Sequence, residues 1–278
     1  MFRTVEKKVE EPQKLIDIVS AEVESRKKAK KIIDEGLCSV NGVKNLYYRK
    51  LVKPQSIVRF SVPEFLFKKK DFQILFEDEY LIVVNKPPFI NSNKDFPNIE
   101  VLLRKKYKDA LVVHRLDKHT TGALIVAKSK RVFDLFVDLF KKRKVKKIYT
   151  VLVADEISKK KGRITIPLDG KEAVTNFRLI EDLGSTSLLE VEILTGRKHQ
   201  IRKHFSFLSH PVVGEFKYWK RRFKNPLHLF APRIMLHAKL IAFPHPVNGR
   251  TVRVEAPLFK DFEDYLEFLK KGGSIPQS

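Results

Sequence analysis

The sequence has almost none of the sulfur chemistry that builds disulfides and cysteine-rich metal sites. Its 278 residues include 1 cysteine, Cys38, and 2 methionines. A single cysteine excludes a disulfide framework and a zinc site of several thiolates, and we expect Cys38 to be a buried thiol. The first 11 residues mix both charges and lack the apolar stretch of a signal peptide. Apolar runs such as 81–84 are far shorter than the about 20 residues of a membrane-spanning helix, so we expect a cytoplasmic protein without a membrane partner.

Acidic residues are scarce relative to basic ones. Lysine and arginine number 56 against 33 aspartates and glutamates, which gives a formal net charge of +23. The simplest partner for such a surface is a polyanion, because lysine and arginine release counterions from phosphates when they bind nucleic acid. A surface of ion pairs, as in heat-adapted proteins, is the alternative. An anionic membrane is a third partner class, but no basic amphipathic anchor or lipidation motif supports it.

A change of pattern near Pro63 divides the chain into two regions. A proline and three consecutive lysines occupy this stretch, and a chain of this length is typical of two domains. We predict a small N-terminal domain, a linker and a larger C-terminal domain, at residues 1–63 (core 14–62), 64–71 and 72–278.

The N-terminal region combines a basic helix with a β-hairpin. Ser25 is a typical helix N-cap, and Gly36 is placed to end the helix. The dipeptide Asn41-Gly42 then favours a hairpin turn. Such a helix and hairpin can present positive charge to the phosphates of structured RNA, whereas a charged module without a ligand is the alternative. The candidate RNA contacts lie on the helix and are Arg26, Lys27 and Lys30.

Strands outnumber helices in the C-terminal region, without a regular alternation of strand and helix. Its apolar patterning predicts helices at 99–106, 131–146 and 198–208, and strands at 72–76, 80–85, 111–113, 123–127, 149–153, 173–179, 188–194, 235–242 and 252–255. This pattern predicts an α+β fold with a largely antiparallel or mixed sheet.

Two polar clusters in this region are candidates for a catalytic site. Residues 114–122, HRLDKHTTG, lie between two apolar strands, where catalytic groups are often presented. An isolated aspartate such as Asp117 is, however, more often a turn or cap residue. Residues 195–204, TGRKHQIRKH, place a glycine before a helix, and glycine allows a ligand to approach closely. Because His199 and His204 are five residues apart, and paired helical metal ligands are four apart, we expect no metal site.

A third feature is the alternating segment 147–153. Alternation places Lys147, Tyr149 and Val151 on one face of a strand. Tyr149 can then stack on a base, an interaction worth about 1–3 kcal/mol, although a core aromatic is the more common role.

Several motifs of the C-terminal region resemble those of RluA-type pseudouridine synthases. They are HRLDKHTTGALIVAKS, ILFEDEYLIVVNKP, KKIY, TGRKHQIRKHF with HPVVGEFKYW, and MLHAKLIAFPHPVNGRTVRVEAPL. They occur in the family's order and cover residues 72–258. Residues 14–62 resemble the small RNA-binding domain of ribosomal protein S-four, through SRKKA, IIDEG and VNG. Such a domain is a frequent attachment in this family.

The resemblance implies an isomerase that converts uridine to pseudouridine in structured RNA, without a cofactor or metal. Asp117 corresponds to the nucleophilic carboxylate, which attacks or deprotonates the sugar. Arg115 corresponds to the residue that replaces the flipped base in the RNA stack. Tyr149 would pack against the uracil and assist removal of its C5 proton. Arg202, with Arg197 as the alternative, would pair with Asp117.

The remaining candidate RNA contacts of this region are His114, Thr121, Arg197, His199 and Gln200. The resemblance favours ribosomal RNA of the large subunit over transfer RNA, and a monomer is the family default. Rival functions are a non-catalytic RNA-binding factor and a different RNA enzyme, such as a methyltransferase or nuclease. Intact Asp117, Tyr149 and Arg202 argue against the first. The lack of a glycine-rich cofactor loop and of a carboxylate cluster argues against the second.

The motifs depart from the family pattern at four places. Thr121 replaces a serine, Ser209 replaces a glycine, and Glu215 replaces an aspartate. Pro88-Phe89-Ile90 stands where a proline, a small residue and a glycine are usual. We expect these changes to alter loop shape without touching the proposed nucleophile, tyrosine or arginines.

Overall fold

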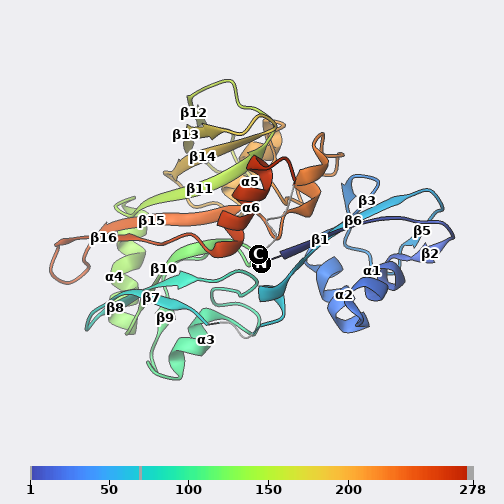
Figure 1. The fold of residues 1–278 in the computed structure, drawn as a ribbon. Helices are drawn as coiled ribbons and strands as arrows, with labels where there is room; N and C mark the ends of the chain where they lie inside the picture. The colour runs from blue at the N-terminus through green and yellow to red at the C-terminus, as the bar shows by residue number, and fades with distance from the viewer. Residues whose placement is uncertain (1, 69–70, 274–278) are drawn as a thin grey trace.

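The computed structural model describes residues 2–68 and 71–273, which form a small N-terminal lobe beside a long sheet (Figure 1). The N-terminal lobe, residues 2–68, contains four antiparallel strands in the order β1-β6-β3-β4. Their bounds are Phe2–Lys8 for β1, Ile57–Pro63 for β6, Cys38–Val40 for β3 and Val43–Lys44 for β4. The lobe also holds helices α1 (Leu15–Val23) and α2 (Arg26–Asp34), and the strand pair β2 (Gln13–Lys14) with β5 (Leu51–Val52).

The sequence does not predict β1, and the reason is its pattern of burial. The strand pairs with β6 along its whole length, from Phe2 opposite Pro63 to Lys8 opposite Ile57. Only Phe2 and Val5 of β1 are buried, and their spacing of three hides the period of two by which a strand is recognised. Phe2 reaches beyond the lobe, since its ring centroid lies 5.9 Å from that of Tyr265.

The predicted ends of helix α2 are confirmed. The hydroxyl of Ser25 accepts a hydrogen bond from the backbone N–H of Lys28, and Gly36 follows the helix with φ +69°. A Cβ at position 36 would lie 2.5 Å from the ring of Phe216. Glycine is therefore required both for the positive φ and for the close approach of the lobe to the C-terminal region. The hairpin at Asn41-Gly42 is also present, between β3 and β4.

The C-terminal region is built on a ten-stranded sheet, and this confirms the predicted α+β fold. Eight strands follow the order β12-β13-β14-β11-β15-β10-β8-β7, while β16 pairs with β15 and β9 with β10. Neighbouring strands among the described residues are antiparallel except β10 and β15, which are parallel, so the sheet is mixed. The bounds are Gln73–Glu77 (β7), Leu81–Lys86 (β8), Leu111–Val112 (β9), Thr121–Ala127 (β10), Lys146–Ala154 (β11), Lys161–Ile164 (β12), Thr175–Asp182 (β13), Thr186–Ile193 (β14), Leu236–Pro244 (β15) and Thr251–Glu255 (β16).

The helices of this region are α3 (Ile99–Arg104), α4 (Lys130–Lys141), α5 (Gln200–Phe207) and α6 (Lys260–Lys270). The helix expected at 131–146 is too long, because Arg143 adopts φ +53° and the chain then enters β11. Helix α5 begins at Gln200 and not at Lys198, since His199 has φ +56°. Strand β12 and helix α6 are not among the elements predicted from the sequence.

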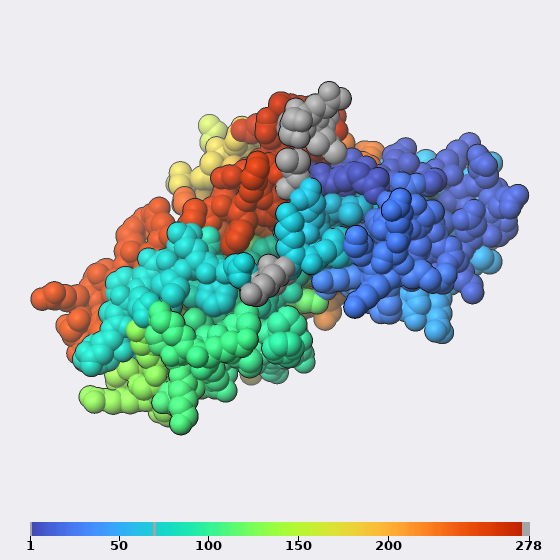
Figure 2. Space-filling model, turned by 60° about the horizontal axis from the view of Figure 1, so that its bottom comes forward, coloured from blue at the N-terminus to red at the C-terminus, as the bar shows by residue number. Residues whose placement is uncertain are grey.

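The N-terminal lobe lies directly against the C-terminal region, as the space-filling view shows (Figure 2). The ammonium group of Lys44 donates to the carbonyl of Leu229 at 2.8 Å, and the hydroxyl of Ser61 donates to that of Ala231 at 3.1 Å. Leu66, in a single turn of 3₁₀ helix at Glu64–Leu66, is buried in the core of the lobe. Part of the segment predicted as a linker is thus packed onto the lobe. In the described part of the chain, no helix has the length and apolar character needed to cross a membrane.

Candidate active site

The two polar clusters and the alternating segment 147–153 meet in one pocket of about 410 Å³. One wall is the segment 114–120, which we call the aspartate loop and which connects β9 to β10. A second wall is the face of β11 that carries Lys147 and Tyr149, and a third is the segment 196–202 at the start of α5. The lining residues with ionisable or aromatic side chains are His114, Arg115, Asp117, Phe140, Lys147, Tyr149, Arg197, Lys198, His199 and Arg202.

Asp117 presents its carboxylate to two basic side chains of the α5 segment. One oxygen, Oδ2, lies 3.3 Å from Nη1 of Arg202, and the other, Oδ1, lies 3.5 Å from Nε2 of His199. The carboxylate side chain is 26% exposed, so it is accessible from the pocket. Its main chain is held in a turn, where the N–H of Thr120 donates to the carbonyl of Asp117 at 3.0 Å. The expected pairing of Asp117 with Arg202, and not with Arg197, is thus what the geometry shows.

Arg202 is itself fixed by Glu215. Its Nε and Nη2 donate to the two oxygens of Glu215 at 2.7 and 2.9 Å, and the Glu215 side chain is fully buried. Burial alone would raise the pKa of Glu215, but the hydrogen bonds and charge of Arg202 outweigh it and hold the pKa below its ordinary value. Our expectation that the departures leave the arginines untouched was wrong, because the glutamate at 215 makes the bidentate pair that orients Arg202.

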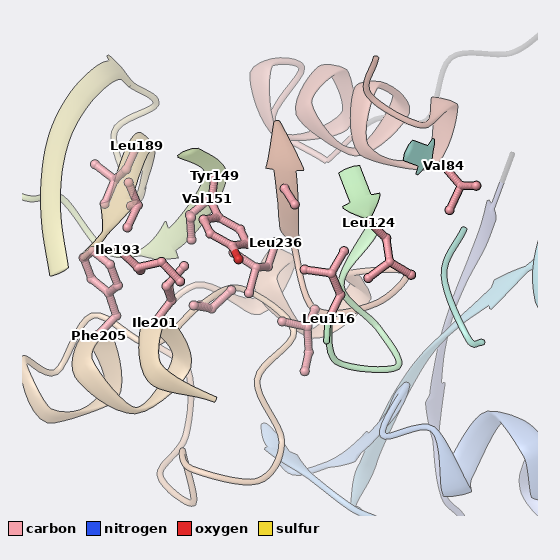
Figure 3. Packing of buried hydrophobic residues seen from close by; sticks show 14 of the residues in the cluster. Val84, Leu116, Leu124, Tyr149, Val151, Leu189, Ile193, Ile201, Phe205 and Leu236 are labelled. Atoms are coloured by element: carbon pink, nitrogen blue, oxygen red, sulfur yellow. The ribbon is translucent and has the colours of Figure 1, made fainter. Parts of the chain in front are cut away.

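Tyr149 packs at the base of the pocket. In Figure 3 its ring projects from β11 beside Val151 and Leu236, and its side chain is 7% exposed. Burial, followed by the charge of Asp117, raises the pKa of the phenol well above its ordinary value. The ring therefore contributes an apolar face and a protonated hydroxyl at neutral pH.

Lys147 lies on the same face of β11, as the alternation predicts. Its ammonium group is 5.6 Å from the centroid of Phe140, and burial lowers its pKa to about 8. No carboxylate within the described ranges forms an ion pair with it, so its charge is available to a ligand.

The histidines of the pocket are neutral at neutral pH. His114 accepts a hydrogen bond from the N–H of Ile125 at 3.1 Å, and burial lowers its pKa to about 3. His199 bonds through Nδ1 to the hydroxyl of Tyr218, and burial lowers its pKa to about 4 although Asp117 opposes the shift. Neither imidazole adds a positive charge to the pocket.

Two predicted RNA contacts are committed to internal hydrogen bonds. Thr121 is fully buried, and its hydroxyl bonds to Nδ1 of His237 at 2.8 Å. Gln200 is 3% exposed, and its amide group bonds to Thr195 and to the carbonyl of Val174. The structure thus gives both residues a role in holding the walls, and Thr121 is absent from the pocket lining.

The two remaining arginines of the prediction also line the pocket. Arg115 is exposed to solvent. Arg197 donates from Nε to the carbonyl of Glu172 at 2.8 Å, which anchors its guanidinium away from Asp117.

The basic residues predicted on the N-terminal helix lie outside this pocket. Arg26, Lys27 and Lys30 line a separate hollow of about 700 Å³ on the lobe, together with Lys14, Ile16, Tyr48 and Arg49. The ammonium group of Lys30 is 4.9 Å from the ring centroid of Tyr48. The hollow therefore combines cations with an aromatic ring.

Comparison with known proteins assigns the family. A family model described as RNA pseudouridylate synthase matches residues 80–207. An uncharacterized RNA pseudouridine synthase of Mycoplasma pneumoniae is 32% identical in an alignment that covers 88% of each chain. The chain belongs to the RNA pseudouridine synthases. The enzyme is therefore an isomerase whose substrate is RNA.

Two further likenesses are relevant to this synthase. The ribosomal large subunit pseudouridine synthase C of Pasteurella multocida is 33% identical in an alignment that covers 72% of this chain and 68% of that protein. The structure of human RNA pseudouridylate synthase domain containing 4 has a TM-score of 0.61 at 24% identity, covering 71% of this chain and 92% of that one. This structural likeness supports the fold.

Proposed function

We propose that this synthase isomerises a uridine of large-subunit ribosomal RNA, with Asp117 as the nucleophile. The observation that carries the proposal is the accessible carboxylate of Asp117, placed between Arg202 and His199 in a basic pocket. The relative from Pasteurella multocida, named for the large ribosomal subunit, supports this RNA over transfer RNA.

The reaction breaks the N1–C1′ bond of uridine and forms a C5–C1′ bond. The proton on C5 leaves and N1 takes up a proton, so no atom is gained and no oxidant is required. Asp117 attacks or deprotonates the sugar, and Arg202 places a positive charge beside it. The raised pKa of Tyr149 favours packing of its ring on the uracil over removal of the C5 proton.

A base inside a helix cannot reach this pocket, so the target nucleotide must leave its stack, at a cost of a few kcal/mol. Arg115 lines the pocket and is exposed, which suits a side chain that fills the gap. Lys147, with no acidic partner among the described residues, is placed to contact a phosphate or the uracil carbonyls.

The N-terminal lobe is proposed to be an S-four-like RNA-binding domain, with residues 1–63 as its extent and the catalytic domain starting at residue 72. Its sheet, two helices and hairpin carry the basic hollow around Arg26, Lys27 and Lys30. These side chains would bind phosphates next to the target, which adds affinity without sequence information.

Pseudouridine mapping in cells that lack the gene tests the choice of RNA. We expect one or a few sites of the large-subunit ribosomal RNA to lose the modification. Complementation with the wild-type gene should restore it, and complementation with an Asp117→Asn gene should not. Loss confined to transfer RNA would overturn the ribosomal assignment.

A further inference from the structure

The N-terminal lobe contacts the aspartate loop through a buried carboxylate. Glu35, the residue that follows helix α2, forms an ion pair with the ammonium group of Lys118. Its second oxygen lies 2.9 Å from Nε2 of His119. Glu35 is 7% exposed, and both of its partners directly follow Asp117 in the chain.

His119 is enclosed on the lobe side of the loop. Its ring is edge-on to Phe89, with centroids 4.8 Å apart, and 5.4 Å from the ring of Phe216. Burial lowers the pKa of His119, although the neighbouring Glu35 opposes this shift. For Glu35, burial alone would raise the pKa, but the hydrogen bonds and charges of His119 and Lys118 outweigh it and lower the pKa to about 2. The imidazole is therefore neutral and donates from Nε2–H to an ionised carboxylate, so Glu35 fixes both its tautomer and its orientation.

The catalytic region holds the carboxylate of Asp117 less tightly. The nearest basic atoms are 3.3 and 3.5 Å from its oxygens, which is longer than the about 2.7–2.9 Å of a strong charge-assisted bond. The direction of the side chain thus depends on the main chain of the loop. That main chain is held at Leu116, whose N–H and carbonyl both bond to the hydroxyl of Ser92, and at Lys118, whose carbonyl accepts the N–H of Phe89 at 2.8 Å. Glu35 in turn holds the side chains of Lys118 and His119.

We propose that Glu35 is a positioning residue, through which the N-terminal lobe holds the aspartate loop and presents Asp117 for reaction. The lobe then completes the active site in addition to binding RNA. Arg26, Lys27 and Lys30 lie on the same helix that Glu35 follows, a rigid element of about 1.5 Å per residue. The inference rests on the role proposed for Asp117.

The test compares Glu35→Ala and the isosteric Glu35→Gln with Asp34→Asn, a matched control. Asp34 is the neighbouring acid of the same helix, and it is exposed and pairs with Lys30 instead of the loop. Single-turnover tritium release is measured with enzyme in excess over large-subunit ribosomal RNA, transcribed in vitro with uridine labelled at C5.

For Glu35→Ala we expect a rate at saturating enzyme that is about 10- to 100-fold lower, since a misplacement of about 1 Å can cost about 100-fold. The half-saturating concentration should stay within about twofold of wild type, because the RNA-contacting side chains of the lobe are unchanged. Glu35→Gln should lose less than Glu35→Ala, since it keeps the side-chain volume and its amide oxygen can still accept from one of the two partners, and Asp34→Asn should match wild type. An unchanged saturating rate, a loss confined to half-saturation, or an equal loss in Asp34→Asn would overturn the proposal.

A double-mutant comparison separates positioning from general stability. If Glu35 acts through its two partners, Glu35→Ala should add no further loss in a Lys118→Ala/His119→Ala background. Full additivity would contradict the proposal.

Hydrogen exchange gives a readout that does not depend on turnover of this RNA. In Glu35→Ala the amides of residues 117–121 should exchange faster than in wild type and in Asp34→Asn. Unchanged exchange in Glu35→Ala would refute the role of the Glu35 contact. Failure of the wild type to modify ribosomal RNA would instead refute only the assignment of the substrate.

Discussion

The pair formed by Glu215 and Arg202 allows a quantitative prediction. The Glu215 side chain is fully buried and that of Arg202 is 5% exposed. Replacing Glu215 with alanine leaves a buried guanidinium without its bidentate partner. Removal of one member of a buried pair typically costs about 3–5 kcal/mol.

Such a loss is a large part of the about 5–15 kcal/mol that stabilises a typical protein. At roughly 2–4 °C per kcal/mol for a chain of this size class, the Tm of Glu215→Ala should fall by about 6–20 °C. Glu215→Asp, which restores the usual family residue, should cost only about 1 kcal/mol, the range expected for one lost methylene. Thermal melts followed by circular dichroism, with urea unfolding as a second measure, provide the test.

The pH dependence of stability gives a second test of the contribution of Glu215. The folded-state pKa of Glu215 is below its ordinary value of 4.5. The contribution of its ionised carboxylate to the free energy of unfolding is therefore fully present above pH 4.5 and is lost as the pH falls through the folded-state pKa. The difference in stability between wild type and Glu215→Ala should therefore shrink in acid. A loss below about 1 kcal/mol at pH 7 would refute the view that this buried pair organises the site.

Three further predictions concern other parts of the molecule. Because the pKa of Lys147 is about 8, its positive charge is lost as the pH rises through 8. At pH values above 8 the half-saturating RNA concentration should therefore increase for wild type but not for Lys147→Met. A parallel increase for both proteins would show that Lys147 does not bind RNA. Burial raises the pKa of Cys38 to about 12, so a thiol-specific colorimetric reagent should react only after denaturation, and rapid reaction of the native protein would contradict this. Arg26→Glu combined with Lys30→Glu should weaken RNA binding and reduce the slope of log affinity against log salt by about 1–2, whereas an unchanged salt series would show that this helix does not contact RNA.

Local chemistry made part of the fold predictable. The N-cap at Ser25, the helix end at Gly36 and the turn at Asn41-Gly42 depend on neighbouring residues, and each is found where the sequence indicates. The alternation of β11 likewise placed Lys147 and Tyr149 on one face, and both line the pocket.

Contacts between segments far apart in the chain were harder to predict from the sequence. Strand β1 is stabilised by β6, whose partner residues lie 49 to 61 positions further along the chain, from Lys8 opposite Ile57 to Phe2 opposite Pro63, and its own sequence shows no alternation. Helix α6 packs Phe262 and Tyr265 into the interior, and its sequence has the spacing of apolar residues that is typical of a helix, although the helix is not among the predicted elements.

In the active site, too, the local motifs were predictable from the sequence and the long-range contacts were not. The motifs identified the residues that meet in the pocket, but not the two glutamates that hold them. Glu35 and Glu215 are acidic residues outside the helices and strands. Glu35 contacts His119 because the lobe packs against the aspartate loop, and Glu215 contacts Arg202 because that side chain is buried beside it. Thr121 looked like a polar loop residue, yet it begins a buried strand.

The most direct test of the central claim is tritium release from RNA that contains uridine labelled at C5, comparing wild type with Asp117→Asn. Ribosomal and transfer RNA without prior modification serve as substrates. The account predicts release by the wild type and none by the variant. Equal release by both would remove Asp117 from its role while leaving the reaction intact, and no release by the wild type from either RNA would contradict the proposed activity itself.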